Sequence, residues 1–377
     1  MPNDSSFFFN ESAQTYEPSR YPPVDQIVRF HQTLVGYEHT PLHDLGRVAS
    51  VGCGKVLLKD ESNRYGLPSF KILGASWAVC QALTSKVGLS TNTTLPALKD
   101  ALQSRRLRLF AATDGNHGRA VARMGSMLGV DVQIYVPAGL PRSTIDLIRS
   151  ENATVVQSAC NYDGAIQEAY QAARDIGDEG VLVQDFAFAS YCEIPQWIVD
   201  GYSTMFHEIE LQIGGMVPDL IVVPVGVGSF AQSVVTYYKR HNPATAILVV
   251  EPQSAPCLHR SLLAGHPTTL ITSETIMTGL ECGTVSETAW PILRDGVDAS
   301  VVIPEHAAHQ ALTSLEMEHG IKVGPCGAAP LAAIRRLSAK DKSLLRLSND
   351  SIILLLCTEG PREYVVPRAV QLNTELR

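Results

Sequence analysis

The sequence predicts an α/β fold made of two three-layer αβα domains with mostly parallel sheets. The first observation is the length: at 377 residues, the chain exceeds the size at which one hydrophobic core keeps growing, so two domains are expected. The second is a regular alternation of short apolar strands and helical segments over residues 107–183. The third is a similar alternation that begins near residue 194. Such alternation favours right-handed crossovers and therefore parallel sheets.

The elements of both series can be placed from hydrophobic patterning. In the first series, strands are expected at residues 107–112, 132–136, 153–157 and 181–183, and helices at 115–128, 143–150 and 162–176. In the second series, a long helix at 194–211 precedes strands at 220–224 and 246–251, with a helix at 229–239 between them. Helices are also expected at 304–319 and 327–337, and a closing strand at 352–357.

The N-terminal third is less regular. Residues 1–25 are polar and contain proline, so they are predicted to form a loose arm. The remaining expectations are a short extended segment at 30–42, a strand at 55–61, a turn marked by Gly66 and Pro68, a helix at 72–83, and a loop at 84–105 that leads to a short helix.

Composition and charge exclude several classes of protein. The net charge of −8 argues against a nucleic-acid partner, which would require a basic face. No apolar run approaches the length that spans a membrane, and residues 7–9 are too short for the core of a signal peptide. The eight cysteines are scattered and contain no Cys-x-x-Cys pair. Reduced thiols in a cytoplasmic setting are therefore expected.

Lys71 is the first candidate for chemistry. It lies between the turn at 66–68 and an apolar helix, where Ser69 could cap the helix N-terminus. The positive end of the helix dipole and partial burial both disfavour an ammonium ion. Lys71 is therefore predicted to hold a neutral amine, the form that attacks an aldehyde. The alternative is an ordinary lysine that extends from a helix start into solvent.

A glycine turn follows the expected strand at 220–224. Gly226 and Gly228 precede a helix, and at this place in a parallel sheet ligands commonly bind. Glycines let backbone N–H groups converge, and a helix N-terminus adds positive potential, so the turn suits a dianionic phosphate. It is neither a dinucleotide fingerprint nor a Walker A loop. The alternative is a packing turn without a ligand.

A second turn, at residues 112–118, carries polar side chains. Its backbone N–H groups and Thr113 could hold a carboxylate, and Asn116 could donate to a phenolate-like oxygen. Asp114 at a helix start is expected to stay ionised, which suits a proton acceptor. The alternative interpretation makes Asp114 a helix cap and leaves Asn116 and His117 as turn residues.

Taken together, these motifs resemble the fold type II pyridoxal-phosphate enzymes, the group of tryptophan synthase β and threonine dehydratase. Within that group the chain resembles the diaminopropionate ammonia-lyases. The stretches that carry the resemblance are residues 30–42, 59–78, 112–118, 183–202, 275–291 and 358–360. The resemblance implies a large cofactor-binding domain (1–74 and 191–377), a small substrate-side domain (75–190) and a homodimer.

The resemblance also implies a role for each matching residue. The catalytic residues would be Lys71, which forms the Schiff base with pyridoxal 5′-phosphate, and the acid–base residues Asp114 and Asp185. The other cofactor-binding residues would be Phe70 against the ring, Asn116 at the ring's 3-oxygen, Gly226, Val227, Gly228, Ser229 and Phe230 at the phosphate, and Cys357 facing the pyridine nitrogen. The substrate-binding residues would be Thr113, Asp114, Gly115, His117 and Asp185.

The implied reaction is β-elimination of 2,3-diaminopropionate to pyruvate and ammonia, with a base on each face of the substrate. Cys357 is a weak hydrogen-bond partner, which favours elimination over transamination. The chain departs from the resemblance at Pro361-Arg362-Glu363, at Cys357 and after Asp185. Two alternatives therefore stay open. One is another β-eliminase or β-replacement enzyme, acting on serine, threonine or a β-substituted alanine. The other is a silent binding protein of the same fold.

Two further motifs have weaker interpretations. His306 and His309 could lie on one helical face, but no third ligand is evident, so we interpret them as a surface face without metal. Cys282 has no histidine base placed by the sequence, and we assign it to a substrate loop.

Overall fold

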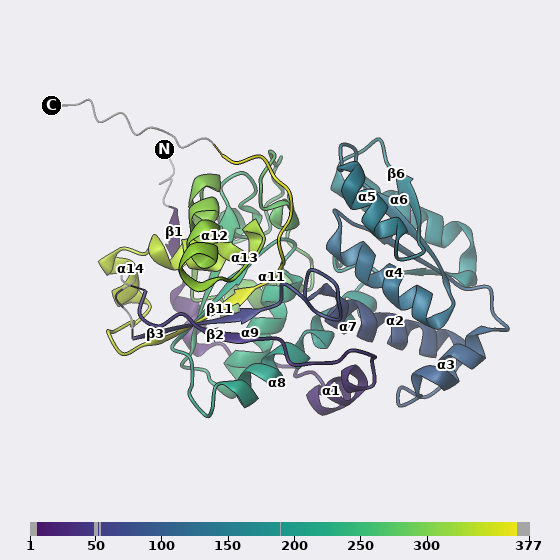
Figure 1. The fold of residues 1–377 in the computed structure, drawn as a ribbon, viewed down its shortest axis with the longest axis horizontal. Coiled ribbons are helices and arrows are strands. Elements are labelled where there is room, and N and C mark those ends of the chain that lie inside the picture. Colours follow the sequence, from purple (N-terminus) through teal and green to yellow (C-terminus); the bar gives the residue numbers. More distant parts are fainter. Residues whose placement is uncertain (1–5, 49–51, 53, 189, 368–377) are drawn as a thin grey trace.

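The computed structural model describes residues 6–48, 52, 54–188 and 190–367. These residues form two sheets with helices on both faces of each (Figure 1). The larger sheet contains β1 (Phe7–Phe9), β2 (Leu42–Asp44), β3 (Lys55–Asp60), β8 (Leu220–Pro224), β9 (Ala246–Pro252), β10 (Ala299–Ile303) and β11 (Ile352–Cys357). Its order is β1-β10-β9-β8-β11-β3-β2, and only the two edge strands β1 and β2 run antiparallel to their neighbours.

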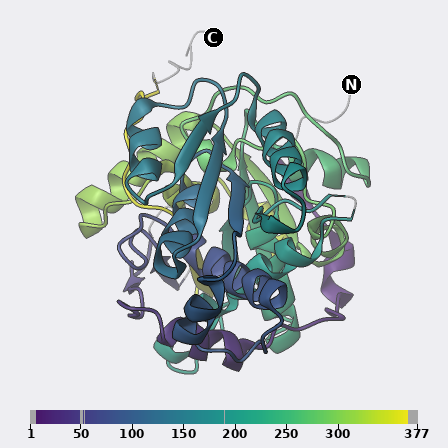
Figure 2. The same cartoon turned by 90° about the vertical axis from the view of Figure 1, so that its right-hand side faces the viewer.

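The smaller sheet is entirely parallel, with the order β6-β5-β4-β7. Its strands are β4 (Arg108–Ala112), β5 (Asp131–Val136), β6 (Thr154–Gln157) and β7 (Gly180–Leu182). The helices in this part of the chain are α2 (Lys71–Val87), α3 (Leu95–Leu102), α4 (Asn116–Leu128), α5 (Arg142–Arg149) and α6 (Tyr162–Asp175). Figure 2 brings this smaller unit to the front.

The larger sheet is also the middle of three layers. The remaining α-helices are α1 (Val24–Gln32), α7 (Glu193–Gly201), α8 (Ser203–Gln212), α9 (Ser229–His241), α10 (Cys257–Ala264), α11 (Ala289–Gly296), α12 (Glu305–His319), α13 (Pro325–Arg335) and α14 (Ala339–Leu344). Short 3₁₀ turns lie at Glu11–Thr15, Gly177–Glu179 and Thr278–Leu280. Alternate residues of β11 pack on opposite sides: Leu354 and Leu356 join the core under α8 and α9, whereas Ile353 and Leu355 join the core under α12 and α13. Both faces of this strand are therefore buried, as expected for a central parallel strand.

The predicted α/β class with two three-layer units is confirmed, and the differences concern local elements. Within the arm predicted at residues 1–25, β1 adds an edge strand to the large sheet, and α1 replaces the first part of the extended segment predicted from residue 30. The helix predicted at 194–211 is two helices. The first ends at Gly201, where α7 approaches α2 so closely that a Cβ would lie 2.5 Å from the carbonyl oxygen of Leu73.

Candidate active site

A cavity of about 820 Å³ lies at the carboxyl ends of β8 and β11, facing the start of α4 in the smaller unit. Three of the predicted motifs meet there. Lys71 and Phe70, the turn before α4, and the whole loop 226–230 line the cavity. Ligands of open α/β sheets bind at such carboxyl ends, where the strand order leaves a crevice.

Lys71 is the first residue of α2, and its side chain is 22% exposed. Its Nζ donates to Oδ2 of Asp185 at 2.5 Å. Burial lowers the pKa of Lys71, but the charges of Asp185 and Asp114 together raise it above its ordinary value. The predicted neutral amine is therefore wrong for the free protein, because the sequence did not reveal the carboxylate beside it. The predicted cap is also weak: Ser69 Oγ accepts from the Lys71 N–H at 3.4 Å, and the N-cap position itself is Phe70.

Asp185 lies in the segment after β7 and is 3% exposed. Burial alone would raise its pKa, but the charge of Lys71 outweighs this and lowers the pKa of Asp185 to about 2. Its other oxygen accepts from Nε2 of Gln184 at 3.4 Å. Lys71 and Asp185 thus form a charged pair in which each group stabilises the ionised form of the other.

Asp114 lines the same cavity from the turn before α4. Burial raises the pKa of Asp114, and the positive charges of Arg362 and Lys71 oppose this without cancelling it. The place of Asp114 at a helix start therefore does not lower its pKa, because burial has the larger effect. A carboxyl group with a raised pKa is a stronger proton acceptor once it is ionised, and the role of Asp114 as a base stays a prediction.

Thr113 and Gly115 are not among the residues that line the cavity, so the structure gives them a different role from the predicted contact with substrate, which stays a prediction. The Thr113 hydroxyl is buried and accepts from the N–H groups of Gly115 at 2.8 Å and Gly118 at 3.0 Å. Gly115 has φ +150°, and a Cβ there would lie 3.2 Å from a methyl group of Thr144. These residues hold the turn, while Asp114, Asn116 and His117 face the cavity.

His117 is buried, and its Nε2 lies 2.8 Å from the carbonyl oxygen of Val183. A carbonyl only accepts, so Nε2 carries the hydrogen and Nδ1 is an acceptor. Nδ1 is buried without a partner among the described residues. Burial lowers the pKa of His117, so the ring is neutral and offers one acceptor to the cavity.

The loop 226–230 has the shape of an anion cradle. Gly228 has φ +96° and is the N-cap of α9, so the helix N-terminus points at the cavity. A Cβ at Gly226 would lie 2.9 Å from the carbonyl oxygen of Gly279, and one at Gly228 would lie 2.9 Å from a methyl group of Leu293. The rings of Phe70 and Phe230 pack with centroids 4.3 Å apart beside it. Glycine is therefore required at 226 by the nearby backbone and at 228 chiefly by the positive φ.

Cys357 is not among the residues that line the cavity, and its place at the cofactor ring stays a prediction. It ends β11 on the face toward α13, where its Sγ lies 3.6 Å from the carbonyl oxygen of Glu359. The next residue, Thr358, lines the cavity, and its Oγ1 is buried without a partner among the described residues. Strand alternation explains the shift of one position. The sequence would have predicted Thr358 if it had shown which alternate residues at the end of β11 face the cavity.

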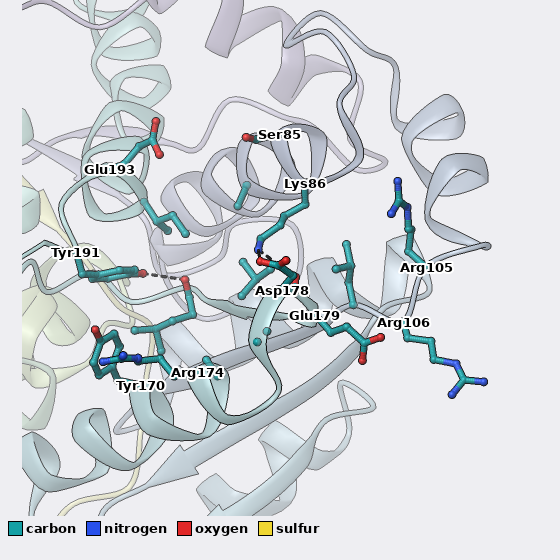
Figure 3. A pocket seen from close by; sticks show the side chains of 18 of the residues that line it. Ser85, Lys86, Arg105, Arg106, Tyr170, Arg174, Asp178, Glu179, Tyr191 and Glu193 are labelled. Carbon is teal, nitrogen blue, oxygen red and sulfur yellow. Dashed lines mark hydrogen bonds and ion pairs between the residues drawn. The ribbon is translucent and has the colours of Figure 1, made fainter.

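A second cavity, of about 900 Å³, lies between α2, α6, β7 and α7 (Figure 3). None of the predicted site residues lines it. Nζ of Lys86 donates to the carbonyl oxygen of Asp178 at 3.0 Å, and Figure 3 shows Arg105 and Arg106 extending away from the cavity. It brings no nucleophile and base together, so the chemistry belongs to the first cavity.

One member of the histidine pair, His309, contacts the C-terminal segment after β11. His309 Nδ1 lies 2.8 Å from the hydroxyl of Tyr364, and both rings are half-buried. Over the described ranges, no group of three His, Cys, Asp or Glu side chains could hold a metal ion. In the same part of the chain, no helix is both long and apolar enough to cross a membrane.

Comparison with known proteins identifies the family. Residues 34–359 match the family described as pyridoxal-phosphate dependent enzyme. The chain belongs to this family. The diaminopropionate ammonia-lyase of Escherichia coli (strain K12) is 33% identical over 95% of this chain and 92% of its own length. That of Salmonella typhimurium is 36% identical over 73% of this chain and 71% of its own length. The predicted resemblance is thereby confirmed.

Solved structures agree with this assignment. The crystal structure of the Escherichia coli diaminopropionate ammonia-lyase in complex with D-serine matches with a TM-score of 0.85 and 30% identity, and the match covers 94% of this chain and 93% of that one. Maize serine racemase matches with a TM-score of 0.73 at 24% identity, which shows the shared fold alone. The predicted fold type II architecture is confirmed.

The cavity fits pyridoxal phosphate on its own geometry. The glycine cradle at 226–228 suits the phosphate, Lys71 suits the aldehyde, and the unpartnered Thr358 hydroxyl can meet the pyridine nitrogen. The cofactor would supply the electron sink that carbanion chemistry requires. The residues present therefore suit the cofactor that defines the family.

Proposed function

We propose that this protein is a pyridoxal-phosphate-dependent ammonia-lyase that converts 2,3-diaminopropionate and water to pyruvate and two molecules of ammonia. The observation that carries the choice of substrate is the charge of the cavity. Carboxylates outnumber cations among its lining residues: Asp114, Asp185, Glu274, Glu281, Glu305, Glu359 and Glu363 stand against Lys71 and Arg362. This excess suits a substrate with a second ammonium group, because opposite charges attract strongly where water is scarce.

The residues of the chain divide the work. Lys71 holds the cofactor and accepts the α-proton of one enantiomer at Nζ, and Asp114 accepts the α-proton of the other. Asp185 keeps Lys71 oriented and exchanges a proton with Nζ. The backbone N–H groups of Asn116 and His117, in the first turn of α4, would orient the α-carboxylate, and His117 would contribute a neutral acceptor. The β-amino group then departs as ammonia, and hydrolysis releases the second ammonia.

The ring nitrogen is expected to meet Thr358. A hydroxyl is not an acid at neutral pH and does not keep the pyridine nitrogen protonated as a carboxylate would. Weak protonation limits the build-up of a long-lived carbanion, which favours loss of a β-substituent over transamination. The argument made from the sequence, that a weak hydrogen-bond partner at the ring nitrogen favours elimination, therefore applies to Thr358 in place of Cys357.

The experiment is a substrate panel. Purified protein with pyridoxal phosphate is assayed for pyruvate and ammonia with D- and L-2,3-diaminopropionate, serine, threonine and β-chloroalanine. The proposal expects diaminopropionate to have the highest kcat/KM and to yield two ammonia per pyruvate. Faster turnover of serine or threonine would support the first alternative, a different β-eliminase. Absence of the cofactor's visible absorbance and of all turnover would support the silent binding protein.

We also propose the arrangement implied by the family resemblance. Residues 1–74 and 191–377 would bind the cofactor, and residues 75–190 would close over a small amino-acid substrate. A homodimer in the cytoplasm is proposed, and the buried thiols of Cys80, Cys257 and Cys326 suit a reducing compartment. Light scattering after gel filtration tests the oligomeric state.

A further inference from the structure

Glu359 is a buried carboxylate that adds to the charge of the cavity but has no individual role in the chemistry above. It lies two residues beyond β11 and is 3% exposed. Its Oε1 accepts from the N–H of Cys326 at 3.0 Å, in the first turn of α13. The N-terminus of α13 presents backbone N–H groups and the positive end of the helix dipole to this side chain. Oε1 of Glu359 is thus held by α13, a helix that packs on the larger sheet.

The second oxygen points across the cavity to the smaller unit. Oε2 accepts from Nδ2 of Asn116 at 3.4 Å, and Nη1 of Arg362 lies 3.8 Å away. Asn116 is the first residue of α4, so this contact joins the two units at the site. Arg362 is half-buried and adds a positive charge beside the carboxylate.

In the contact between Glu359 and Asn116, the Asn116 amide is the hydrogen-bond donor. An ionised carboxylate only accepts, so the Asn116 amide must turn its nitrogen toward Glu359. One N–H is then used by Glu359 and the other is left for the cavity. We propose that Glu359 is a positioning residue, which fixes the Asn116 amide so that its free N–H faces the ring oxygen of the cofactor. The proposal rests on the cofactor assignment and is independent of which amino acid is the substrate.

The test is a double-mutant cycle on cofactor affinity. Apo protein is titrated with pyridoxal phosphate, and the Kd is read from quenching of tryptophan fluorescence for the wild type, Glu359→Gln, Asn116→Ala and the double variant. Glu359→Gln places an NH₂ group beside Asn116 and is expected to turn the amide over. Loss of one oriented hydrogen bond should weaken binding about tenfold. In the Asn116→Ala background the same change should cost less than about twofold.

Equal losses in both backgrounds would overturn the proposal, because Glu359 would then act only by capping α13. Unchanged affinity in Glu359→Gln would overturn it as well. The matched control is Glu17→Gln, the same chemical change at an exposed position that does not line the cavity. Thermal unfolding of each apo variant measures the capping contribution separately. If diaminopropionate is not a substrate, the proposed function fails while this cycle can still hold.

Discussion

Two turns of the same kind face each other across the cavity, and they differ in what they offer. The loop before α9 and the turn before α4 each follow a parallel strand and open a helix toward the site. The loop 226–230 presents backbone, and none of its side chains is ionisable. The turn presents Asp114, Asn116 and His117, and keeps its own shape through the buried Thr113 hydroxyl.

The difference shows how one topological position can serve either binding or chemistry. Where glycines remove the side chains, backbone N–H groups and the helix dipole converge on an anion. Where polar side chains replace them, the same helix start places a base and a donor over the substrate. Lys71 lines the same cavity as the two turns. In the proposed mechanism it links their functions, because it would bond the cofactor that the loop 226–230 holds.

The largest expected effect comes from removing the amine of Lys71. Lys71→Ala should lower activity by at least about a thousandfold, because it removes both the covalent attachment and one base. The glycine loop should still bind pyridoxal phosphate, but without the visible absorbance of the bound cofactor. Absorption spectra and pyruvate assays measure both. Lys86→Ala, at the other end of α2, is the control and should behave as wild type. An unchanged visible band in Lys71→Ala would refute the assignment.

The next effect separates the two bases. Asp114→Asn should lower kcat/KM for the D-enantiomer by about 10²–10⁴-fold and should change the L-enantiomer far less. The pKa of Asp114 is raised and only the ionised form accepts a proton, so D-turnover should fall as pH decreases through a value above the ordinary range of aspartate. Rates for both enantiomers across pH provide the measurement. Equal slowing of both enantiomers would remove the two-base mechanism.

The backbone turn can be broken without touching a functional side chain. Gly228→Ala places a Cβ at a positive φ and within 2.9 Å of Leu293, so the loop must shift. Strain of about 1–3 kcal/mol in the binding conformation should weaken cofactor affinity by about ten- to a hundredfold. Gly129→Ala is the matched control: φ is +73°, and nothing lies within 4 Å of the added Cβ. It should cost stability while leaving the Kd for pyridoxal phosphate unchanged.

The two turns also show what a sequence reveals. Gly226, Gly228 and Lys71 were predicted because glycine and a lysine at a helix start are local signals. The protonation of Lys71 was not predicted, since its partner Asp185 is distant in the chain and meets it only after folding. The edge strand β1 was missed for the same reason. Fold class survives such errors because it depends on the alternation of many elements rather than on any one contact.

The smallest effect decides which residue meets the ring. Thr358→Val keeps the shape of the side chain and removes the hydroxyl, so it should weaken cofactor affinity about three- to tenfold by deleting one hydrogen bond. Cys357→Ala removes a thiol that faces α13, so its cost should appear in thermal unfolding and not in the Kd for pyridoxal phosphate. If Cys357 rather than Thr358 faces the cavity, the two results should be exchanged: Cys357→Ala should weaken cofactor affinity and Thr358→Val should lower thermal stability. A loss of cofactor affinity in Cys357→Ala, without one in Thr358→Val, would support the contact between Cys357 and the pyridine nitrogen that was inferred from the sequence.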